Sequence, residues 1–447
     1  MKVALVSLGC SRTLVDSEVA LGSLAKEGYT IVREVKDADV AIVNTCGFIE
    51  EAKTESIDVI LELCALKKKG KLSAVVVLGC LAQRYGKEIA EEIKEADAII
   101  GTNNYGDLAK VLEPLKKKKK VFKVEPKPYY LLDENTPRFS LTPPHLSYVK
   151  ISEGCINACS YCVIPKMKGP HRSRQIDSVV AEIAALRRDR NVQEVNLIGQ
   201  DTAAFGYDLD RTFQLPKLLH AVAATGVPWL RLLYAHPGHV SEDMIDALAA
   251  HPNLCKYVDF PIEHSHDAML LRMNRQVTRE RMEWGITMMR KKIPGVAIRT
   301  TLIVGFPGET EAEFRDLMDF LKEKRFERLG AFRYSAEEGA RSVGMPNPIA
   351  PELSKERYDA VMELQRSIST ELNERRVGSI LNVLVEERGE DEGVYFSRSE
   401  YDAPDVDGQV IVNSKRPLEI GSFVSARIVD ALEYDLIAEP ASERSVR

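Results

Sequence analysis

Short apolar runs alternate with longer stretches of mixed polarity over the first 112 residues. The apolar runs are residues 3–7, 39–44 and 74–78, rich in valine, isoleucine and alanine. Helical patterns are expected at residues 16–27, 50–66, 84–94 and 105–112. Short β-branched runs between helices are typical of buried parallel strands. The pattern therefore predicts a parallel α/β domain.

The alternation resumes at residue 146. Strands are expected at residues 147–151, 194–198, 230–234, 257–260, 297–304 and 329–334, with helices between them, for example 178–190 and 279–292. Six β/α repeats predict a partial parallel (β/α)6 barrel, with its active site at the carboxyl ends of the strands. After a closing helix at 357–376, short strands at 381–387, 408–412 and 422–428 predict a small antiparallel β-barrel.

The chain is therefore expected to be an α/β multidomain protein. Its 447 residues are more than a single hydrophobic core usually serves, so two or three domains are expected. The expected divisions are an α/β domain at 1–125, a linker at 126–144, a barrel at 145–376 and a β-barrel at 377–441. The lysine run at 116–120 and the proline-rich stretch after it mark the first boundary. That run could touch rRNA, but a solvated linker is favoured.

Three cysteines lie close together in the loop that follows the first barrel strand. Cys155, Cys159 and Cys162 have the spacing C-x3-C-x2-C. Thiolates in one tight loop select a thiophilic centre, most often an iron–sulfur cluster. Three ligands leave one iron of a cubane open, and an open site indicates chemistry. The alternative is a zinc site with His171 or Cys255 as fourth ligand, although zinc loops usually present cysteines in pairs.

Three further cysteines each follow an apolar run of the first domain. Cys10, Cys46 and Cys80 stand where the predicted strands end. Ligands of parallel sheets bind outside the carboxyl ends of the strands, so these thiols can converge and hold a second cluster. The alternative is three buried structural thiols. Cys64 and Cys255 lack this context and are interpreted as core or surface residues.

The two triads, in this order, resemble the methylthiotransferase branch of the radical S-adenosylmethionine enzymes, over residues 1–440. Four motifs refine the resemblance: SLGCSRTLVD at 7–16, GQDT at 199–202, RLLYAHP at 231–237 and YDAPDVDG at 401–408. Within the branch they are similar to enzymes that modify an aspartate of small-subunit ribosomal protein twelve. In the tRNA-modifying enzymes Asp201 would more usually be Asn.

The resemblance implies two [4Fe-4S] clusters, S-adenosyl-L-methionine as cofactor and a C-terminal domain called TRAM. It also implies that one S-adenosylmethionine would methylate a sulfur at the Cys10/Cys46/Cys80 cluster. A second would be cleaved at the catalytic Cys155/Cys159/Cys162 cluster to a 5′-deoxyadenosyl radical, which would take hydrogen from the aspartate β-carbon. In this scheme the carbon radical would then capture the methylthio group.

The resemblance and the position of the strand ends also imply contacts to the cofactor. These residues are Tyr161, Arg172, Arg174, Gln200, Asp201 and Gly305. His236 also follows a barrel strand, but we expect it to be a satisfied core histidine. Two positions depart from the family: Glu263 and Gln276 stand where relatives commonly carry Gln and Gly.

The charge distribution bears on the partner. Residues 379–447 hold 7 Lys/Arg against 15 Asp/Glu, a net −8, whereas the whole chain has a net charge of −6. Such a domain would repel RNA and attract a basic protein; the alternative is an acidic surface that only aids solubility. We therefore expect ribosomal protein twelve, free or in the assembled subunit, and no direct tRNA binding. An electron donor such as flavodoxin or ferredoxin is also implied.

Two other function classes remain open from the sequence. The nearer one is a tRNA adenosine methylthiotransferase. The other is a two-cluster electron carrier, although carriers normally ligate every iron. No apolar run approaches the ~20 residues of a membrane span, and no signal-peptide pattern is present. Eight cysteines are too few for a disulfide scaffold. A cytoplasmic protein without a membrane partner is expected.

Overall fold

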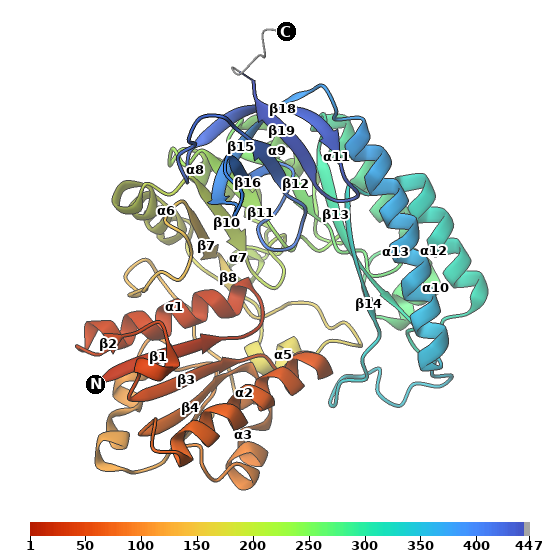
Figure 1. Ribbon diagram of the computed structural model, residues 1–447. Helices are drawn as coiled ribbons and strands as arrows, with labels where there is room; N and C mark the ends of the chain where they lie inside the picture. The colour runs from red at the N-terminus through yellow and green to blue at the C-terminus, as the bar shows by residue number, and fades with distance from the viewer. Residues whose placement is uncertain (442–447) are drawn as a thin grey trace.

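The computed structural model describes residues 1–441. Its N-terminal part is a six-stranded parallel sheet of order β2-β1-β3-β4-β5-β6 (Figure 1). The strands are β1 (Lys2–Ser7), β2 (Thr30–Ile31), β3 (Val40–Thr45), β4 (Ala74–Gly79), β5 (Ala98–Ile100) and β6 (Val121–Lys123). The helices are α1 (Ser11–Lys26), α2 (Glu50–Lys68), α3 (Cys80–Glu92) and α4 (Leu108–Val111), with short 3-10 turns η1 (Val35–Asp37) and η2 (Glu113–Lys117). The predicted parallel α/β domain is confirmed.

Two helices of this domain begin earlier than the sequence pattern indicates. The helix expected at 16–27 starts at Ser11, and the one expected at 84–94 starts at Cys80. The preceding glycines, Gly9 and Gly79, have φ values of 99° and 105°. Glycine tolerates this conformation, so each strand can turn directly into its helix. Cys10 and Cys80 consequently lie at helix N-termini.

The lysine run at 116–120 does not form a linker. Lys116 and Lys117 end η2, and residues 118–120 lead directly into β6, which pairs with β5 at the edge of the N-terminal sheet. The chain between β6 and the next long strand carries no helix or strand, but it packs on α1. Arg138 in this stretch forms ion pairs with Glu18 of α1 and Glu182 of the barrel helix α6 (Ile176–Arg190). The connection is therefore fastened to both units that it joins.

The central part is the expected open barrel of six parallel strands, in the order β14-β13-β12-β11-β10-β7. The strands are β7 (Leu146–Lys150), β10 (Glu194–Ile198), β11 (Trp229–Leu232), β12 (Leu254–Asp259), β13 (Ala297–Val304) and β14 (Arg328–Arg333). A small hairpin pairs β8 (Ser152–Glu153) with β9 (Arg172–Ser173). The helices after α6 are α7 (Tyr207–Asp210), α8 (Leu215–Ala223), α9 (Glu242–Ala250), α10 (Asp267–Arg272), α11 (Arg279–Lys292) and α12 (Glu311–Lys324); α5 (Ile164–Lys168) precedes β9. Alternate residues on the outer face of the strands pack against these helices in one large apolar core.

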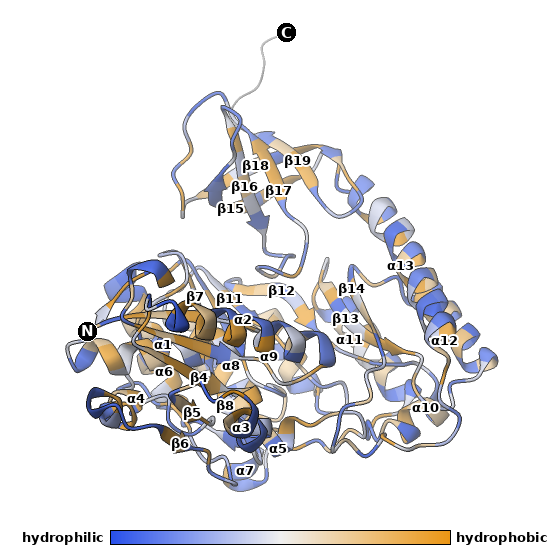
Figure 2. Cartoon of the chain, turned by 60° about the horizontal axis from the view of Figure 1, so that its bottom comes forward, coloured by the Kyte–Doolittle hydropathy of each residue, from blue (hydrophilic) through white to orange (hydrophobic). Residues whose placement is uncertain are grey.

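The long helix α13 (Pro351–Glu374) leads from the open barrel to a small closed β-barrel, and it carries both hydrophilic and hydrophobic residues along its length (Figure 2). The small barrel has the order β15-β16-β17-β19-β18. Its strands are β15 (Ile380–Arg388), β16 (Val394–Ser399), β17 (Val410–Asn413), β18 (Phe423–Ala431) and β19 (Leu436–Pro440). The β-barrel is confirmed, but β17 and β19 pair in parallel, so it is not wholly antiparallel.

The end of β16 and the segment that follows it join the small barrel to the inner face of the open barrel. Glu194 on β10 accepts from Arg231 Nε at 2.9 Å and from Arg398 Nη2 at 2.6 Å, and all three side chains are buried. Arg231 also donates to the main-chain oxygen of Glu400 at 2.8 Å. One glutamate on the inner face of the open barrel thus binds one arginine from each domain.

The acidic motif at 401–408 completes this junction. Asp402 pairs with Arg328, and Asp407 accepts from the Tyr257 hydroxyl at 2.7 Å. Asp407 also pairs with Arg299 at 3.3 Å. These carboxylates neutralise arginines of the open barrel, so they are not available to attract a partner. The net charge of the C-terminal domain overstates the charge on its surface.

Among residues 1–441, no helix is long and apolar enough to cross a membrane.

Removing Glu194 tests this junction. Glu194→Ala leaves Arg231 and Arg398 buried without a shared carboxylate, a change that costs about 3–5 kcal/mol. We expect the small barrel to separate from the open barrel at a lower urea concentration. Circular dichroism and limited proteolysis after residue 376 measure the midpoint of this separation. Asp359→Ala, which removes an exposed pair with Lys355 on α13, is the control and should cost less than about 1 kcal/mol. Equal effects from both variants would contradict the role of Glu194.

Candidate iron–sulfur sites

The structure brings Cys10, Cys46 and Cys80 to one edge of the N-terminal sheet. They follow β1, β3 and β4, which are neighbours in the sheet. A Cβ atom built on Gly9 would lie 3.4 Å from Cys46 Sγ, which shows how closely the first two loops approach. The thiols of Cys10 and Cys46 also act electrostatically on Cys80. The three thiols therefore form one group.

The environments of these thiols differ. Burial raises the pKa of Cys80 to about 12. Cys10 is accessible to solvent yet surrounded by protein atoms, and this desolvation alone would raise its pKa. The charge of Arg12 and a hydrogen bond from Arg12 Nε to Cys10 Sγ, at 3.4 Å, outweigh it and lower the pKa to about 6. Metals bind the thiolate, so Arg12 prepares Cys10 as a ligand.

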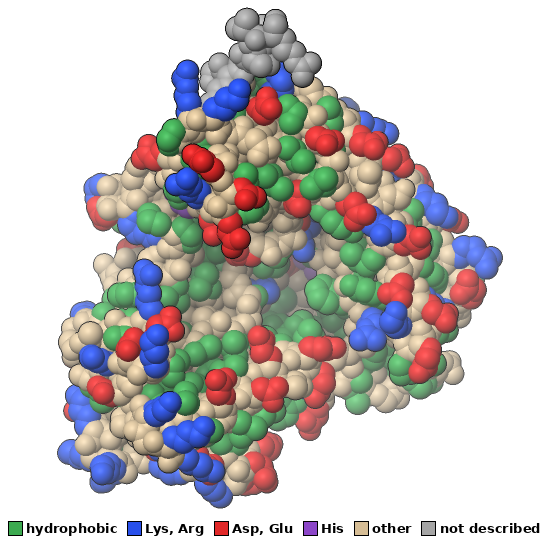
Figure 3. Space-filling view, viewed as in Figure 1, with side chains coloured by type: hydrophobic (Ala, Val, Ile, Leu, Met, Phe, Trp, Pro, Cys, Tyr) green, Lys and Arg blue, Asp and Glu red, His purple; other side chains and the backbone are tan. Residues whose placement is uncertain are grey.

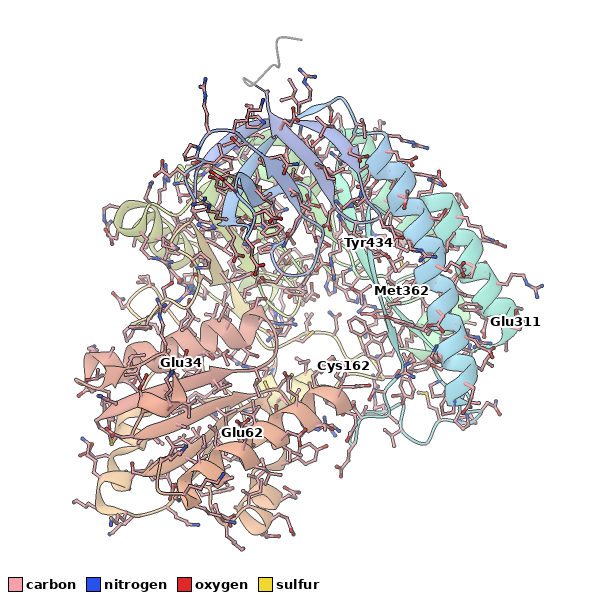
Figure 4. The ribbon with its side chains drawn as sticks, viewed as in Figure 1. Glu34, Glu62, Cys162, Glu311, Met362 and Tyr434 are labelled. Atoms are coloured by element: carbon pink, nitrogen blue, oxygen red, sulfur yellow. The ribbon has the colours of Figure 1, made fainter. Side chains whose placement is uncertain are left out.

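The second triad occupies the loop between β8 and α5. Each sulfur has a nitrogen donor: the Asn157 N–H for Cys155 at 3.4 Å, and the Ile164 N–H for Cys162 at 3.5 Å. The Arg275 guanidinium lies 3.6 Å from the sulfur of Cys159. Hydrogen bonds to sulfur are a principal means of tuning an iron–sulfur cluster. Figure 4 labels Cys162 beside α5.

The two triads face one another across the domain boundary. Cys80 packs in an apolar cluster with Val163, which follows Cys162, and with Met167 of α5. Figure 3 shows a hollow where the N-terminal domain, the open barrel and the small barrel meet. A group held by one triad would therefore lie close to a group held by the other.

Of the two proposed fourth ligands of a zinc site, one lies at the wrong end of a strand and the other has a hydrogen-bond partner. Cys255 is at the start of β12, near Arg231 and Glu194, at the opposite end of the strand from the cysteine loop. His171 Nε2 lies 3.1 Å from the Ser173 hydroxyl. Three thiolates with nitrogen donors at their sulfurs suit an iron–sulfur cluster with one open iron, and the residues of both triads fit that group.

A buried network of charges lies between the triads. Lys150 of β7 binds Asp16 of α1 and, at 2.7 Å, Glu153. Lys168 binds Asp16 at 2.7 Å, and Gln200 donates to Glu153 at 2.8 Å. The four charged residues are at most 5% exposed. Gln200, predicted to contact the cofactor, thus also positions Glu153 two residues before Cys155.

Asp201 is held by three donors at the carboxyl end of β10. Its carboxylate accepts from Asn157 Nδ2 and His239 Nδ1, both at 2.7 Å, and from the main-chain N–H of His236 at 3.3 Å. Burial would raise the pKa of Asp201, but these donors and the nearby histidines hold it well below its usual range. Because Asn157 belongs to the cysteine loop, Asp201 fixes that loop to the barrel.

Asp201, His236 and His239 could also present three ligand atoms to a metal ion. However, His236 Nδ1 accepts from the Gly238 N–H at 3.1 Å, which places the ring proton on Nε2 and removes it as a ligand. His236 is buried, as expected of a core histidine, and its ring also interacts with the main chain of Arg275. The group is a hydrogen-bond network rather than a ready metal site.

The remaining predicted contacts divide into two kinds. Tyr161 lies in the cysteine loop, with Arg275, Glu263 and both neighbouring cysteines acting on its hydroxyl, so its position suits a cofactor contact.

Arg172 instead donates to the main-chain oxygens of Pro170, Lys168 and Tyr130. Arg174 donates to Lys150 O, Glu182 and Ser178. Both guanidinium groups have protein partners, and this favours structural roles for them.

The packing of α13 explains why a glycine stands at position 305. Gly305 follows the last residue of β13 with φ 74°, and a Cβ there would collide with the Ser354 side chain on α13. The two departures from the family both have left-handed backbones: φ is 67° at Glu263 and 52° at Gln276. Glycine, which the family resemblance leads us to expect at position 276, adopts the latter conformation without strain.

Several residues at these sites were missed by the sequence reasoning. They are Arg12, Asp16, Lys150, Glu153, Asn157, His239 and Arg275. Of these, Lys150 at the end of β7 and Glu153 in β8 carried a signal, because charged residues stand there beside buried strands. Most of the partners are far away in the sequence, so no local pattern identifies these pairs.

Three family profiles match the chain. They are described as Uncharacterized protein family UPF0004, at residues 2–101, Radical SAM superfamily, at 149–321, and TRAM domain, at 377–440. Proteins named ribosomal protein uS12 methylthiotransferase RimO are similar over almost their whole length. The one from Desulforamulus reducens is 47% identical, covering 98% of this chain and 99% of its own. The one from Clostridioides difficile is 43% identical, covering 98% of each.

Solved structures share the fold at low sequence identity. The radical S-adenosylmethionine methyltransferase TsrM from Kitasatospora setae is 15% identical with a TM-score of 0.58, covering 85% of this chain and 78% of its own. The cobalamin-dependent radical enzyme OxsB is 11% identical with a TM-score of 0.52, covering 82% of this chain and 56% of its own. These likenesses support the architecture alone.

Iron content tests the two triads. Anaerobically reconstituted protein should hold about eight irons per chain, and Cys46→Ala or Cys159→Ala should each reduce this to about four. Iron and sulfide assays with the ultraviolet–visible spectrum give the measurement. Cys64→Ala, which changes a buried cysteine outside both triads, is the control and should keep about eight. Full iron content in Cys46→Ala would show that Cys46 is not needed to hold a cluster and would contradict the N-terminal triad as a cluster site.

Proposed function

The chain belongs to the RimO family of ribosomal protein uS12 methylthiotransferases, and on this premise we propose that it transfers a methylthio group to the β-carbon of an aspartate in uS12. It is a radical S-adenosylmethionine transferase with two [4Fe-4S] clusters. The observation that carries the proposal is the convergence of two three-cysteine sites at one domain boundary.

Two sites of this kind suit a group transfer better than electron transport. An electron carrier normally ligates every iron with protein side chains. Here each triad supplies three thiols, and both lie at the carboxyl ends of their strands, where parallel sheets bind ligands. Each site can therefore hold a cluster and still bind a reactant.

The substrate carbon explains the need for this arrangement. An aspartate β-CH2 group has no leaving group and a weakly acidic proton, so acid–base catalysis is a poor route to a C–S bond. When bound, the clusters and S-adenosylmethionine supply a carbon radical and a methylated sulfur. The chain's residues must bring these sources together and exclude water.

The chain achieves this through residues around the cysteine loop. Asp201 and Asn157 fix the loop to β10, and Arg275 donates to the sulfur of Cys159. Tyr161 packs with the buried Phe306 beside Met269 and Met273 and closes this side of the loop with apolar atoms. We propose Tyr161, Gln200, Asp201 and Gly305 as the lining of the cofactor site.

The exposed charge supports a protein substrate over RNA. Within residues 379–441, the exposed carboxylates are Glu387, Glu390, Asp391, Glu392, Asp405, Glu419, Asp430, Glu433 and Glu439. The exposed cations are Arg388, Lys415 and Arg416. Nine carboxylates against three cations leave an acidic surface, even though Asp402 and Asp407 pair with the open barrel (Figure 3). Such a surface attracts a basic ribosomal protein and repels phosphates.

Other partners follow from the same proposal. The reaction requires single electrons, for which we propose a donor such as flavodoxin or ferredoxin. Protein uS12 is the proposed substrate either free or in the small ribosomal subunit, and the cytoplasm is the proposed location.

Mass spectrometry of uS12 tests the function. The protein is isolated from a host that lacks its own enzyme, with and without this chain. We expect one methylthio group on one aspartate, only when the chain is present. An unmodified uS12 alongside newly methylthiolated adenosine in the tRNA pool, with both clusters loaded, would overturn the proposal.

Cys46→Ala separates the two cluster sites. The variant should lose methylthio transfer and keep cleavage of S-adenosylmethionine, because Cys155, Cys159 and Cys162 remain. Liquid chromatography–mass spectrometry quantifies the modified peptide and 5′-deoxyadenosine in one reaction, with Cys64→Ala as control. Loss of both products in Cys46→Ala, at intact iron in the second triad, would count against separate roles.

A further inference from the structure

Arg12 contacts both parts of the active site. It lies two residues after Cys10 in the first turn of α1, and its Nε donates to Cys10 Sγ at 3.4 Å. Its Nη1 donates to the main-chain oxygen of Gly199 at 3.1 Å, immediately before Gln200 and Asp201. One guanidinium group therefore joins a cysteine of the N-terminal triad to the carboxyl end of β10.

A third contact fixes the plane of this guanidinium. Its carbon lies 4.3 Å from the ring centroid of Tyr234, at the end of β11. The Tyr234 hydroxyl lies 3.3 Å from the Ser11 hydroxyl, so the neighbouring residue of α1 also contacts this ring. Two consecutive residues of the N-terminal domain thus meet one tyrosine of the open barrel.

Tyr234 reaches this position with a strained backbone. Its φ of 63° lies in the left-handed region, which a bulky residue rarely adopts. Strain of this kind persists where the surroundings require it, and it is concentrated at functional sites. The strain places the ring beneath Arg12 at the boundary between the two triads.

Other arginines cross the same boundary without reaching a cysteine sulfur. Arg84 donates to Gly47 O, Glu337 and Glu338 O, and Arg138 pairs with Glu18 and Glu182. Among the hydrogen bonds of residues 1–441, neither guanidinium donates to sulfur. Arg12 differs from them because it combines a domain contact with a ligand contact.

We propose that Arg12 is a positioning residue that holds the Cys10 side of the N-terminal cluster site against the mouth of the open barrel and tunes that cluster. The inference rests on the proposed function and deepens it. A cationic N–H donor at a ligating sulfur stabilises the more reduced, more negative state of a cluster, so it raises the reduction potential. The contacts of Arg12 with Gly199 and Tyr234 keep the N-terminal cluster site aligned with the carboxyl ends of the barrel strands.

The potential of the N-terminal cluster is the first readout. In the full chain with Cys155, Cys159 and Cys162 all replaced by Ala, only the N-terminal triad can hold a cluster. A redox titration followed by electron paramagnetic resonance then compares Arg12 with Arg12→Gln and Arg12→Lys. We expect a more negative midpoint in Arg12→Gln and a smaller change in Arg12→Lys, which keeps the charge. This comparison does not depend on the identity of the substrate.

The coupling of the two sites is the second readout. In the otherwise native chain, Arg12→Gln should lower the yield of methylthiolated uS12 per 5′-deoxyadenosine by about 10- to 100-fold, the range for residues that support metal ligands. Formation of 5′-deoxyadenosine should be unchanged. Arg138→Gln, which weakens the boundary away from the cysteines, should lower thermal stability and keep both the yield and the potential.

The outcomes separate the alternatives. An unchanged potential and an unchanged yield in Arg12→Gln would overturn the inference. Equal losses in Arg138→Gln and Arg12→Gln would assign Arg12 to general domain packing and would also overturn it. If Arg12→Gln fails to retain iron, the Arg12→Lys variant tests the inference instead. A native potential and a native yield in Arg12→Lys would show that the three contacts of the guanidinium group are dispensable, and this would overturn the inference. If the native chain leaves uS12 unmodified, the proposed function fails, and the potential still decides the role of Arg12 toward the cluster.

Discussion

The buried charges of Asp16, Lys150, Glu153 and Lys168 determine how the two cluster sites meet. Asp16 belongs to α1 of the N-terminal domain, and the other three belong to the barrel or its cysteine loop. A buried carboxylate or ammonium group is costly unless it is paired, so separation of the domains would leave charges without partners. The two halves are thereby held in one arrangement. Because α1 begins directly after Cys10, and Glu153 lies two residues before Cys155, this network also fixes the distance between the triads.

The far end of the barrel is closed by a second set of buried ion pairs. Glu194 binds Arg231 of the open barrel and Arg398 of the small barrel, while Asp402 and Asp407 bind further arginines of the open barrel. The C-terminal domain is therefore fixed to the amino ends of the strands, and the carboxyl ends remain open for chemistry. The small barrel keeps an acidic exposed surface beside the hollow where the three domains meet (Figure 3). One domain thus stabilises the barrel and offers a surface to a basic substrate.

The chemistry of the sites depends on donors to sulfur as much as on the cysteines. Arg12 and Arg275 are cations from different domains, and each donates to one cysteine of its own triad. Main-chain N–H groups supply the other sulfurs of the second triad. Donors of this kind affect the potential of a cluster and the orientation of its ligands. The reaction needs one strongly reducing cluster and one cluster that delivers sulfur, so the two clusters require different environments. Arg12 and Arg275 each lie at a cysteine sulfur, where a donor affects the reduction potential of the cluster.

The sequence by itself determined the elements and the cysteine triads. The strand at 194–198 and the strand at 297–304 were predicted with their observed bounds, because apolar runs and their polar ends are local signals. The same runs placed Cys10, Cys46 and Cys80 at one sheet edge. Tertiary structure alone decided the polar partners: Lys150 meets Asp16 across 134 residues, and Arg398 meets Glu194 across 204. It also gave Arg174 a structural partner. A local pattern records which face of a strand is buried, whereas the partner of a buried charge depends on which distant segment packs there.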